Sequence, residues 1–144
     1  MSSIGSNKTM TSQAAIRSAT AEGLTERVDA IAFLGESVRR RAIAEGPPGP
    51  GRYLEVQGPG ESLLIPLSSG VMHIGRGLSA DLHLDEKSVS RRHAMLVERP
   101  GGARLLDDRS SNGTFVNGRR IVQADLEDGD VIVLGRVVLR YLEI

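Results

Sequence analysis

The sequence predicts an all-β sandwich of ten to eleven short strands, preceded by a helical or partly disordered N-terminal extension. Two observations carry this prediction. From residue 52 onward, short apolar runs alternate with turn residues, and no helical period is visible. Before residue 52, apolar residues instead recur every three or four positions. Many short strands separated by regular turns are typical of a β-sandwich or barrel.

The N-terminal extension is predicted to comprise residues 1–50. Residues 1–10 are rich in Ser and are predicted to be disordered. A helix is predicted over about residues 25–45, with acidic residues near its start and three arginines near its end, as the helix dipole favours. Its apolar positions are Leu24, Val28, Ile31, Leu34, Val38 and Ala42. The Pro/Gly stretch 46–51 cannot continue a helix, so it is predicted to link the extension to a domain at 52–144.

The domain is predicted to consist of strands joined by tight loops. The predicted strands cover residues 53–57, 62–67, 71–74, 81–84, 94–98, 104–107, 114–116, 119–121, 131–134 and 137–143, with a further edge strand near 123–125. Two Asn-Gly pairs, Asn112-Gly113 and Asn117-Gly118, mark tight turns. Because aromatic residues make up only 3% of the chain, the core is expected to be aliphatic.

Composition excludes several classes of function. A net charge of zero, from 18 basic and 18 acidic residues, argues against nonspecific binding to nucleic acid or a membrane surface. The absence of Cys excludes disulfides, thiolate zinc sites and cysteine nucleophiles. No apolar run approaches the ~18 residues of a membrane helix. The N-terminus lacks an apolar signal-peptide core, and we expect a cytoplasmic protein.

Three short signatures occur in a fixed order between residues 75 and 118. Gly75-Arg76 follows an apolar run, and Ser90-Arg91-Arg92-His93 opens the next one. The third signature, at 110–118, carries both Asn-Gly turns. In this order they resemble the forkhead-associated (FHA) domain, a β-sandwich that reads phosphothreonine peptides through loops at one end. The resemblance covers about residues 52–144.

Several loop residues are suited to binding a phosphopeptide. A guanidinium at Arg76 makes charge-assisted contacts to phosphate, although a surface Arg after a turn is the commoner case. The flanking glycines allow a sharp backbone turn there. The Ser90 hydroxyl can donate to a phosphate oxygen, and Arg91 raises the local positive potential. The amide of Asn112 both donates and accepts, which suits a peptide backbone.

His93 is interpreted as structural rather than catalytic. It begins an apolar strand, and no second His or carboxylate pair lies at a metal-ligand spacing from it. A neutral imidazole that hydrogen-bonds the backbone would hold the loop in shape. We therefore expect no metal and no cofactor.

The resemblance implies a role for each residue that matches the family motif. Arg76, Ser90 and Ser111 would contact phosphate with Arg91 beside them, and Asn112 and Asn117 would hold the peptide backbone. The residues that would shape the loops are Gly75, His93, Gly113 and Gly118. Selection of neighbouring peptide residues would fall to Ser88 and to the loops at 77–80 and 126–130.

The predicted function is phosphothreonine-dependent protein interaction downstream of a Ser/Thr kinase, without catalysis. No nucleophile–base pair, GxGxxG or GxxxxGK[ST] motif points to an enzyme. Two alternatives remain open. The sandwich could be a phosphate-independent scaffold or oligomerisation domain, or it could bind its own phosphorylated N-terminal tail. The apolar stripe of the predicted helix could also contact a partner or a second copy of the chain.

Overall fold

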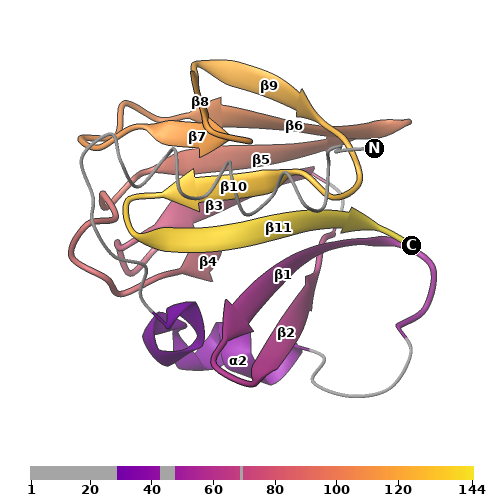
Figure 1. The fold of residues 1–144 in the computed structure, drawn as a ribbon, viewed down its shortest axis with the longest axis horizontal. Helices are drawn as coiled ribbons and strands as arrows, with labels where there is room; N and C mark the ends of the chain where they lie inside the picture. Colours follow the sequence, from indigo (N-terminus) through magenta and orange to yellow (C-terminus); the bar gives the residue numbers. More distant parts are fainter. Residues whose placement is uncertain (1–28, 43–47, 69) are drawn as a thin grey trace.

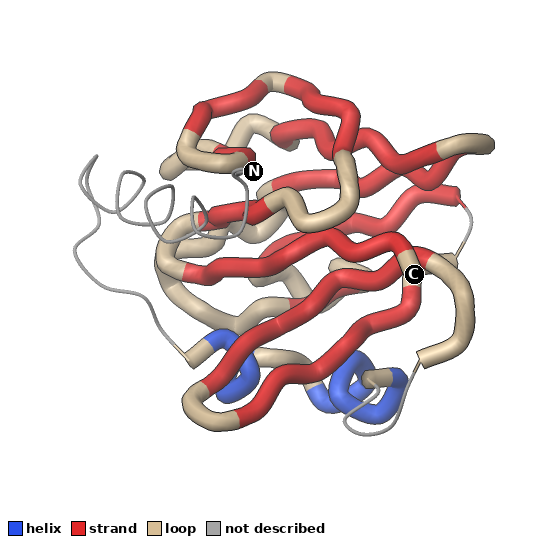
Figure 2. The backbone as a smooth tube through the Cα atoms, turned by 45° about the vertical axis from the view of Figure 1, so that its right-hand side comes forward, coloured by secondary structure: helices blue, strands red, loops and turns tan. Residues whose placement is uncertain are grey.

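The computed structural model describes residues 29–42, 48–68 and 70–144, which form two β-sheets packed face to face (Figures 1 and 2). One sheet has the strand order β2-β1-β11-β10-β7-β8, and the other has the order β4-β3-β5-β6-β9. The strands are β1 (Arg52–Gly58), β2 (Glu61–Pro66), β3 (Gly70–Gly75), β4 (Leu82–His83), β5 (Ala94–Arg99), β6 (Gly102–Asp107), β7 (Thr114–Val116), β8 (Arg119–Ile121), β9 (Gln123–Leu126), β10 (Val131–Leu134) and β11 (Val137–Glu143). The predicted sandwich is confirmed, and each predicted strand is present, including the edge strand.

The last strand lies in the middle of its sheet. β11 pairs with β1 on one side and with β10 on the other, both antiparallel. Its residues alternate, so that Val137, Leu139 and Tyr141 are buried while the residues between them are half-buried. This two-residue period fixes which face of the strand meets the core.

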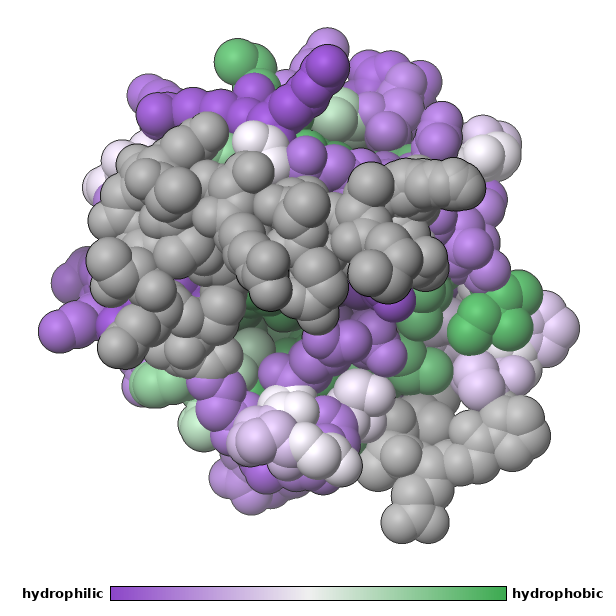
Figure 3. Space-filling view, in the orientation of Figure 1, coloured by the Kyte–Doolittle hydropathy of each residue, from purple (hydrophilic) through white to green (hydrophobic). Residues whose placement is uncertain are grey.

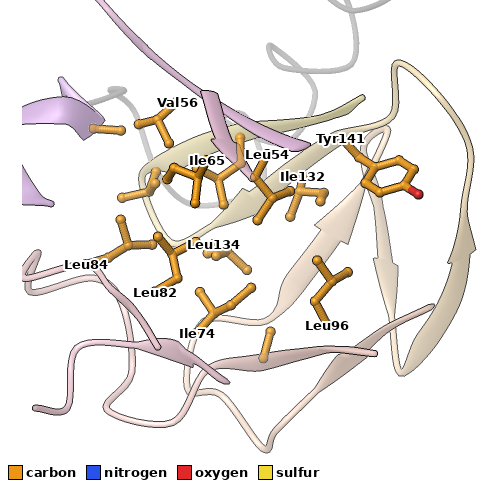
Figure 4. Close-up of a cluster of buried hydrophobic side chains, with 14 of the residues drawn as sticks. Leu54, Val56, Ile65, Ile74, Leu82, Leu84, Leu96, Ile132, Leu134 and Tyr141 are labelled. Carbon is orange, nitrogen blue, oxygen red and sulfur yellow. The ribbon is translucent and has the colours of Figure 1, made fainter. Parts of the chain in front are cut away.

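The core between the sheets is aliphatic. Figure 4 shows side chains of the two sheets pointing toward one another across this layer. The first sheet contributes Leu54, Ile65, Ile132 and Leu134, the second contributes Ile74, Leu82 and Leu96, and Leu84 joins them from the residue after β4. Burial of each such side chain contributes about 2 kcal/mol, so this layer supplies most of the driving force for folding. On the face seen in Figure 3, polar residues dominate the described surface and apolar residues form small patches between them.

The predicted single helix over 25–45 is wrong for the residues that the structure describes. A 3₁₀ turn, η1 (Ala30–Phe33), is followed by a short helix, α2 (Glu36–Arg41), and the chain between them is extended. Leu34 forms a β-bridge with Leu84, and the Gly35 N–H donates to the His83 carbonyl at 3.0 Å. Pairing with β4 therefore overrides the helical period. The parts of this prediction at 25–28 and 43–45, and the disorder predicted for 1–10, lie outside the described residues.

The apolar stripe of this segment packs into the sandwich itself. Ile31, Leu34 and Val38 are buried and belong to the same core cluster as the strands. For these three residues the idea of a contact surface for a partner is corrected, because their side chains already fill the domain's own core. The boundary between extension and domain at residues 50 and 52 stays a prediction. Among the described residues no helix is long and apolar enough to cross a membrane.

Substitution of Val38 by Ala tests this packing. Val38 is fully buried, so its truncation leaves a cavity in the shared core. We expect the free energy of unfolding to fall by about 1 to 3 kcal/mol in urea denaturation. Ser37→Ala, on the exposed face of α2, is the matched control and should change stability by less than about 0.5 kcal/mol. Equal stability of the two variants would show that this segment is not part of the core.

Candidate functional site

Four loops meet at one end of the sandwich. They are the β3–β4 loop (76–81), the β4–β5 loop (84–93), the β6–β7 loop (108–113) and the β10–β11 turn (135–136). Antiparallel pairing brings them together, since Ile74 at the end of β3 faces Ala94 at the start of β5, which in turn faces Asp107 at the end of β6. In the other sheet, the start of β7 faces the end of β10 at Leu134. Rigid strands thus present loops from both sheets side by side.

The end of β3 is joined to the β4–β5 loop by its backbone. The Arg76 N–H donates to the Ser90 carbonyl at 2.9 Å, and the Gly77 N–H donates to the Arg91 carbonyl at 3.1 Å. A Cβ at Gly75 would lie 2.1 Å from the Arg91 carbonyl oxygen, so only glycine fits there. Neither Gly75 nor Gly77 has a positive φ. The sequence analysis expected these glycines to allow a sharp turn. In the structure, glycine is needed at position 75 because two backbone segments approach closely there.

A hydrogen bond to the backbone holds the Arg76 side chain in a fixed direction. Its Nε donates to the Val89 carbonyl at 2.9 Å, and the residue is half-buried. Its two terminal nitrogens have no hydrogen-bond partner among residues 29–42, 48–68 and 70–144. Arg76 lines an open pocket of about 630 Å³ together with Arg91 and Arg92. An anion entering this pocket would meet the already oriented guanidinium of Arg76 and that of Arg91, beside the Arg92 guanidinium that is paired with Asp108.

His93 joins two of the loops from the buried side. The Ser90 N–H donates to its Nδ1 at 3.0 Å, so its Nε2 carries the hydrogen and donates to the Gly113 carbonyl at 2.9 Å. The ring is fully buried, and burial lowers its pKa below the usual range, outweighing the opposite effects of the Gly113 carbonyl and Asp107. The imidazole is therefore neutral and acts as a bridge between the β4–β5 and β6–β7 loops.

The Ser90 hydroxyl lies between these loops on the exposed side. Its Oγ accepts from the Ser111 N–H at 2.9 Å, which leaves the hydroxyl hydrogen available to donate. Ser111 itself is exposed beside it. The sequence-predicted residues Arg76, Ser90, Arg91 and Ser111 are thus gathered by these contacts and by the shared pocket.

The β6–β7 loop is shaped by an internal carboxylate. Asp107 accepts hydrogen bonds from the hydroxyls of Ser110 and Thr114, and the Gly113 N–H donates to Ser110 Oγ at 2.9 Å. Burial alone would raise the pKa of Asp107, but these hydrogen bonds and His93 hold it below its usual range. Gly113 has a φ of 88°, a conformation that only glycine adopts without strain.

Asn112 connects this loop to the β4–β5 loop. Its Nδ2 donates to the Ser88 carbonyl at 2.8 Å, while the residue remains exposed. The Oδ1 and the second amide hydrogen have no hydrogen-bond partner within the described chain, and they suit one donor and one acceptor of a peptide backbone.

The buried carboxylate of Glu86 stabilises the part of the β4–β5 loop that Asn112 contacts. Glu86 accepts from the Ser88 hydroxyl and from Arg136 Nη2, the latter at 2.7 Å, and the Arg136 N–H donates to Ser88 Oγ at 2.8 Å. Burial would raise the pKa of Glu86, but the hydrogen bonds from Ser88 and Arg136 lower it below the usual range. Sequence reasoning missed Glu86 and Arg136, because nothing in the sequence shows that positions 50 residues apart are paired.

Asn117 does not belong to this group. It forms the β7–β8 turn with a φ of 52°, its Nδ2 donates to Asp130 at 2.9 Å, and its Oδ1 accepts from the Val131 N–H at 3.0 Å. Asp130 and Val131 lie at the start of β10, whereas the site lies at its end. Asn117 and its neighbour Gly118 are therefore at the opposite end of the sandwich. The same holds for the 126–130 loop, and its predicted role in selecting peptide residues is corrected.

Arg92 differs from Arg91 in having a partner. Its Nε lies 3.1 Å from Asp108 Oδ2, and its side chain is largely exposed. Arg91 has no side-chain partner in the described part of the chain. Within that part, no group of three His, Asp or Glu side chains is gathered as a metal site would need.

Comparison with known proteins agrees with this geometry. The model of the FHA domain family matches residues 72–135. The glycogen accumulation regulator GarA of Mycobacterium tuberculosis is 31% identical over 115 residues, covering 80% of this chain and 71% of that protein. The ABC transporter ATP-binding/permease protein Rv1747 of the same organism is 46% identical over 77 residues, which is 54% of this chain but only 9% of the transporter.

A solved structure shares the fold. It comes from a study of phosphothreonine-dependent FHA domain interactions, is 35% identical, covers 65% of this chain and 96% of its own, and has a TM-score of 0.59. The chain belongs to the FHA domain family. Its loop residues at 75–77, 90–93 and 110–113 stand at the loop end of that fold.

The buried neutral His93 makes stability depend on pH. In the unfolded chain a histidine binds a proton near pH 6.5, whereas folded His93 does so only at lower pH. The free energy of unfolding should therefore fall as the pH drops from about 7 to about 5, by up to about 1.4 kcal/mol per pH unit. Glu86 and Asp107, whose pKa values are lowered, should lose their contributions only at more acidic pH.

Urea denaturation at three pH values measures this slope. His93→Gln should flatten it, and His73→Gln, at an exposed position, is the matched control that should leave it unchanged. A His93→Gln variant that folds and keeps the full slope would contradict the assignment to His93.

Removal of Arg136 tests the stabilising role of its ion pair with Glu86. Arg136→Met leaves the buried Glu86 without its cation, so we expect a loss of about 1 to 3 kcal/mol in the free energy of unfolding. The double variant Glu86→Gln/Arg136→Met should lose less than Arg136→Met alone, because no uncompensated charge remains. Additive losses in this double-mutant cycle would show that the two groups are not coupled.

Proposed function

We propose that this chain binds phosphothreonine-containing proteins through the loop end of its FHA domain and acts in signalling downstream of a Ser/Thr kinase. The FHA domain is a binding module, and we extend this to the chain as a whole, which on this proposal catalyses no reaction. We place it in the cytoplasm and propose that it requires no metal or cofactor.

The observation that carries this proposal is a pocket lined by two guanidinium groups without an ion pair among the described residues, Arg76 and Arg91, beside the ion-paired Arg92. Arg76 is oriented by the Val89 carbonyl, and Arg91 lines the same pocket with no side-chain partner in the described residues. Ser90 precedes Arg91 on the β4–β5 loop, and its hydroxyl keeps a hydrogen to donate. A phosphorylated threonine offers a charge of about −1.5 to −2 and three acceptor oxygens. Donors and positive charge thus match what a phosphate needs.

We assign the roles as follows. Arg76, Ser90, Arg91 and Ser111 contact phosphate, and Asn112 holds the peptide backbone. Asn117 is structural on this proposal, because both ends of its amide are used within the β7–β8 turn. The similar structure was described for phosphothreonine-dependent interactions of an FHA domain, which supports phosphothreonine as the ligand.

Binding of a phosphothreonine peptide library tests the function. A hydrogen bond to a charged group contributes about 1.5 to 3 kcal/mol, so several of them, less the cost of ordering the peptide, give affinity on the order of micromolar. Arg76→Ala should remove detectable binding in fluorescence polarisation. Arg119→Ala, an exposed arginine at the opposite end of the sandwich, should bind like the unaltered chain.

The alternatives give different outcomes. Equal affinity for phosphorylated and unphosphorylated peptides would overturn the proposal in favour of a phosphate-independent scaffold. Loss of peptide binding after kinase treatment of the full chain would point to a phosphorylated N-terminal tail that occupies the site.

A further inference from the structure

The pocket at Arg76 extends beyond the phosphate-binding groups to two residues that the proposed function leaves unused. Leu78 on the β3–β4 loop and Asp85 at the start of the β4–β5 loop line it together with Arg76 and Arg91. Leu78 is 92% exposed, the most exposed of the large apolar side chains in the described chain. Packing within residues 29–42, 48–68 and 70–144 does not explain a leucine at this position.

Asp85 has no side-chain partner among the described residues. Its backbone is fixed, since its N–H donates to the Phe33 carbonyl at 2.8 Å, but its exposed carboxylate makes no ion pair or hydrogen bond with any residue that the structure describes. The neighbouring carboxylates are paired, Asp108 with Arg92 and Glu86 with Arg136. Asp85 is thus an uncompensated negative charge at the edge of a site for an anion.

The charge balance of the pocket changes when phosphate binds. Arg76 and Arg91 together offset the charge of about −1.5 to −2 on a phosphothreonine. Arg92 also lines the pocket, but its charge is already offset by Asp108. The exposed Lys87, on the same β4–β5 loop as Asp85, and the exposed Arg109, on the β6–β7 loop, do not line this pocket. With phosphate bound, the charge of Asp85 therefore remains and attracts a cation.

We propose that the phosphothreonine ligand carries a lysine or arginine close to the phosphothreonine, with its aliphatic stem on Leu78 and its cation at Asp85. Lys and Arg lay their methylene stems on apolar surface while the charged end stays in water or meets a carboxylate. Leu78 and Asp85 supply those two features in one pocket. This inference rests on the proposed phosphothreonine function and specifies the class of peptide that the site selects.

The test compares phosphothreonine peptides that differ at one flanking position. A reference peptide with alanine on both sides of the phosphothreonine is varied by placing Lys, Gln or Glu at each of the three positions before and after it. At one of these positions the full chain should bind the Lys peptide about three- to five-fold more tightly than the Gln peptide, as an exposed ion pair gives, and the Glu peptide more weakly still. The preference should shrink in high salt.

Two substitutions assign the preference to its residues. Asp85→Asn should bring the affinity ratio of the Lys and Gln peptides close to one, and Asp85→Lys should reverse the order of the Lys and Glu peptides. Glu61→Gln, an exposed carboxylate outside the pocket, is the matched control and should keep the original ratio. Leu78→Ser should weaken the Lys peptide more than the Glu peptide, because the stem of Lys loses its apolar surface.

The binding results that would contradict this inference differ from those that would contradict the proposed function. Phosphate-dependent binding with equal affinities for Lys, Gln and Glu peptides, or a preference that survives Asp85→Asn, would overturn the role of Asp85 and leave phosphothreonine binding intact. Absence of binding to any phosphorylated peptide would overturn both.

Discussion

The loop end of this domain depends on one buried imidazole. His93 accepts from the Ser90 N–H and donates to the Gly113 carbonyl, and it thereby joins two loops that are also linked by the backbone hydrogen bond from the Asp108 N–H to the His93 carbonyl at 2.8 Å. A neutral ring is needed, since only the neutral form accepts at one nitrogen and donates at the other. Full burial keeps it neutral by disfavouring the charged form. The bridge holds Ser90 in place beside Ser111, and these are two of the residues proposed to contact phosphate.

Other contacts stiffen the same loops before any ligand arrives. The close approach at Gly75 locks the end of β3 against the Arg91 carbonyl, and the Glu86–Arg136 pair ties the β4–β5 loop to the β10–β11 turn. Arg76 is oriented by Val89 rather than left to rotate. A site that is already ordered loses less conformational entropy on binding, so more of the hydrogen-bond energy to phosphate appears as affinity.

Some features could be predicted from the sequence because they are local. Alternating apolar residues located β11, and the three loop signatures located Arg76, Ser90 and Ser111. Others depended on contacts between distant residues. Asn117 carries the same Asn-Gly signal as Asn112, yet the direction of β7 puts them at opposite ends of the sandwich. The apolar residues at 31, 34 and 38 are buried in the core, as their spacing suggested. However, they do not lie on one continuous helix, because Leu34 forms a β-bridge with Leu84.

By itself, the sequence determined the fold class, the order of the strands along the chain and the loops that are proposed to bind the phosphopeptide. Strand period and turn residues are set by neighbours a few positions apart, and these can be read without knowing the fold. Only the tertiary structure decided which loops share one end, that Glu86 is compensated by Arg136, and that Asp85 is not compensated within the described residues. The physical reason is that burial and charge balance depend on residues far apart in sequence, which strand pairing alone brings together.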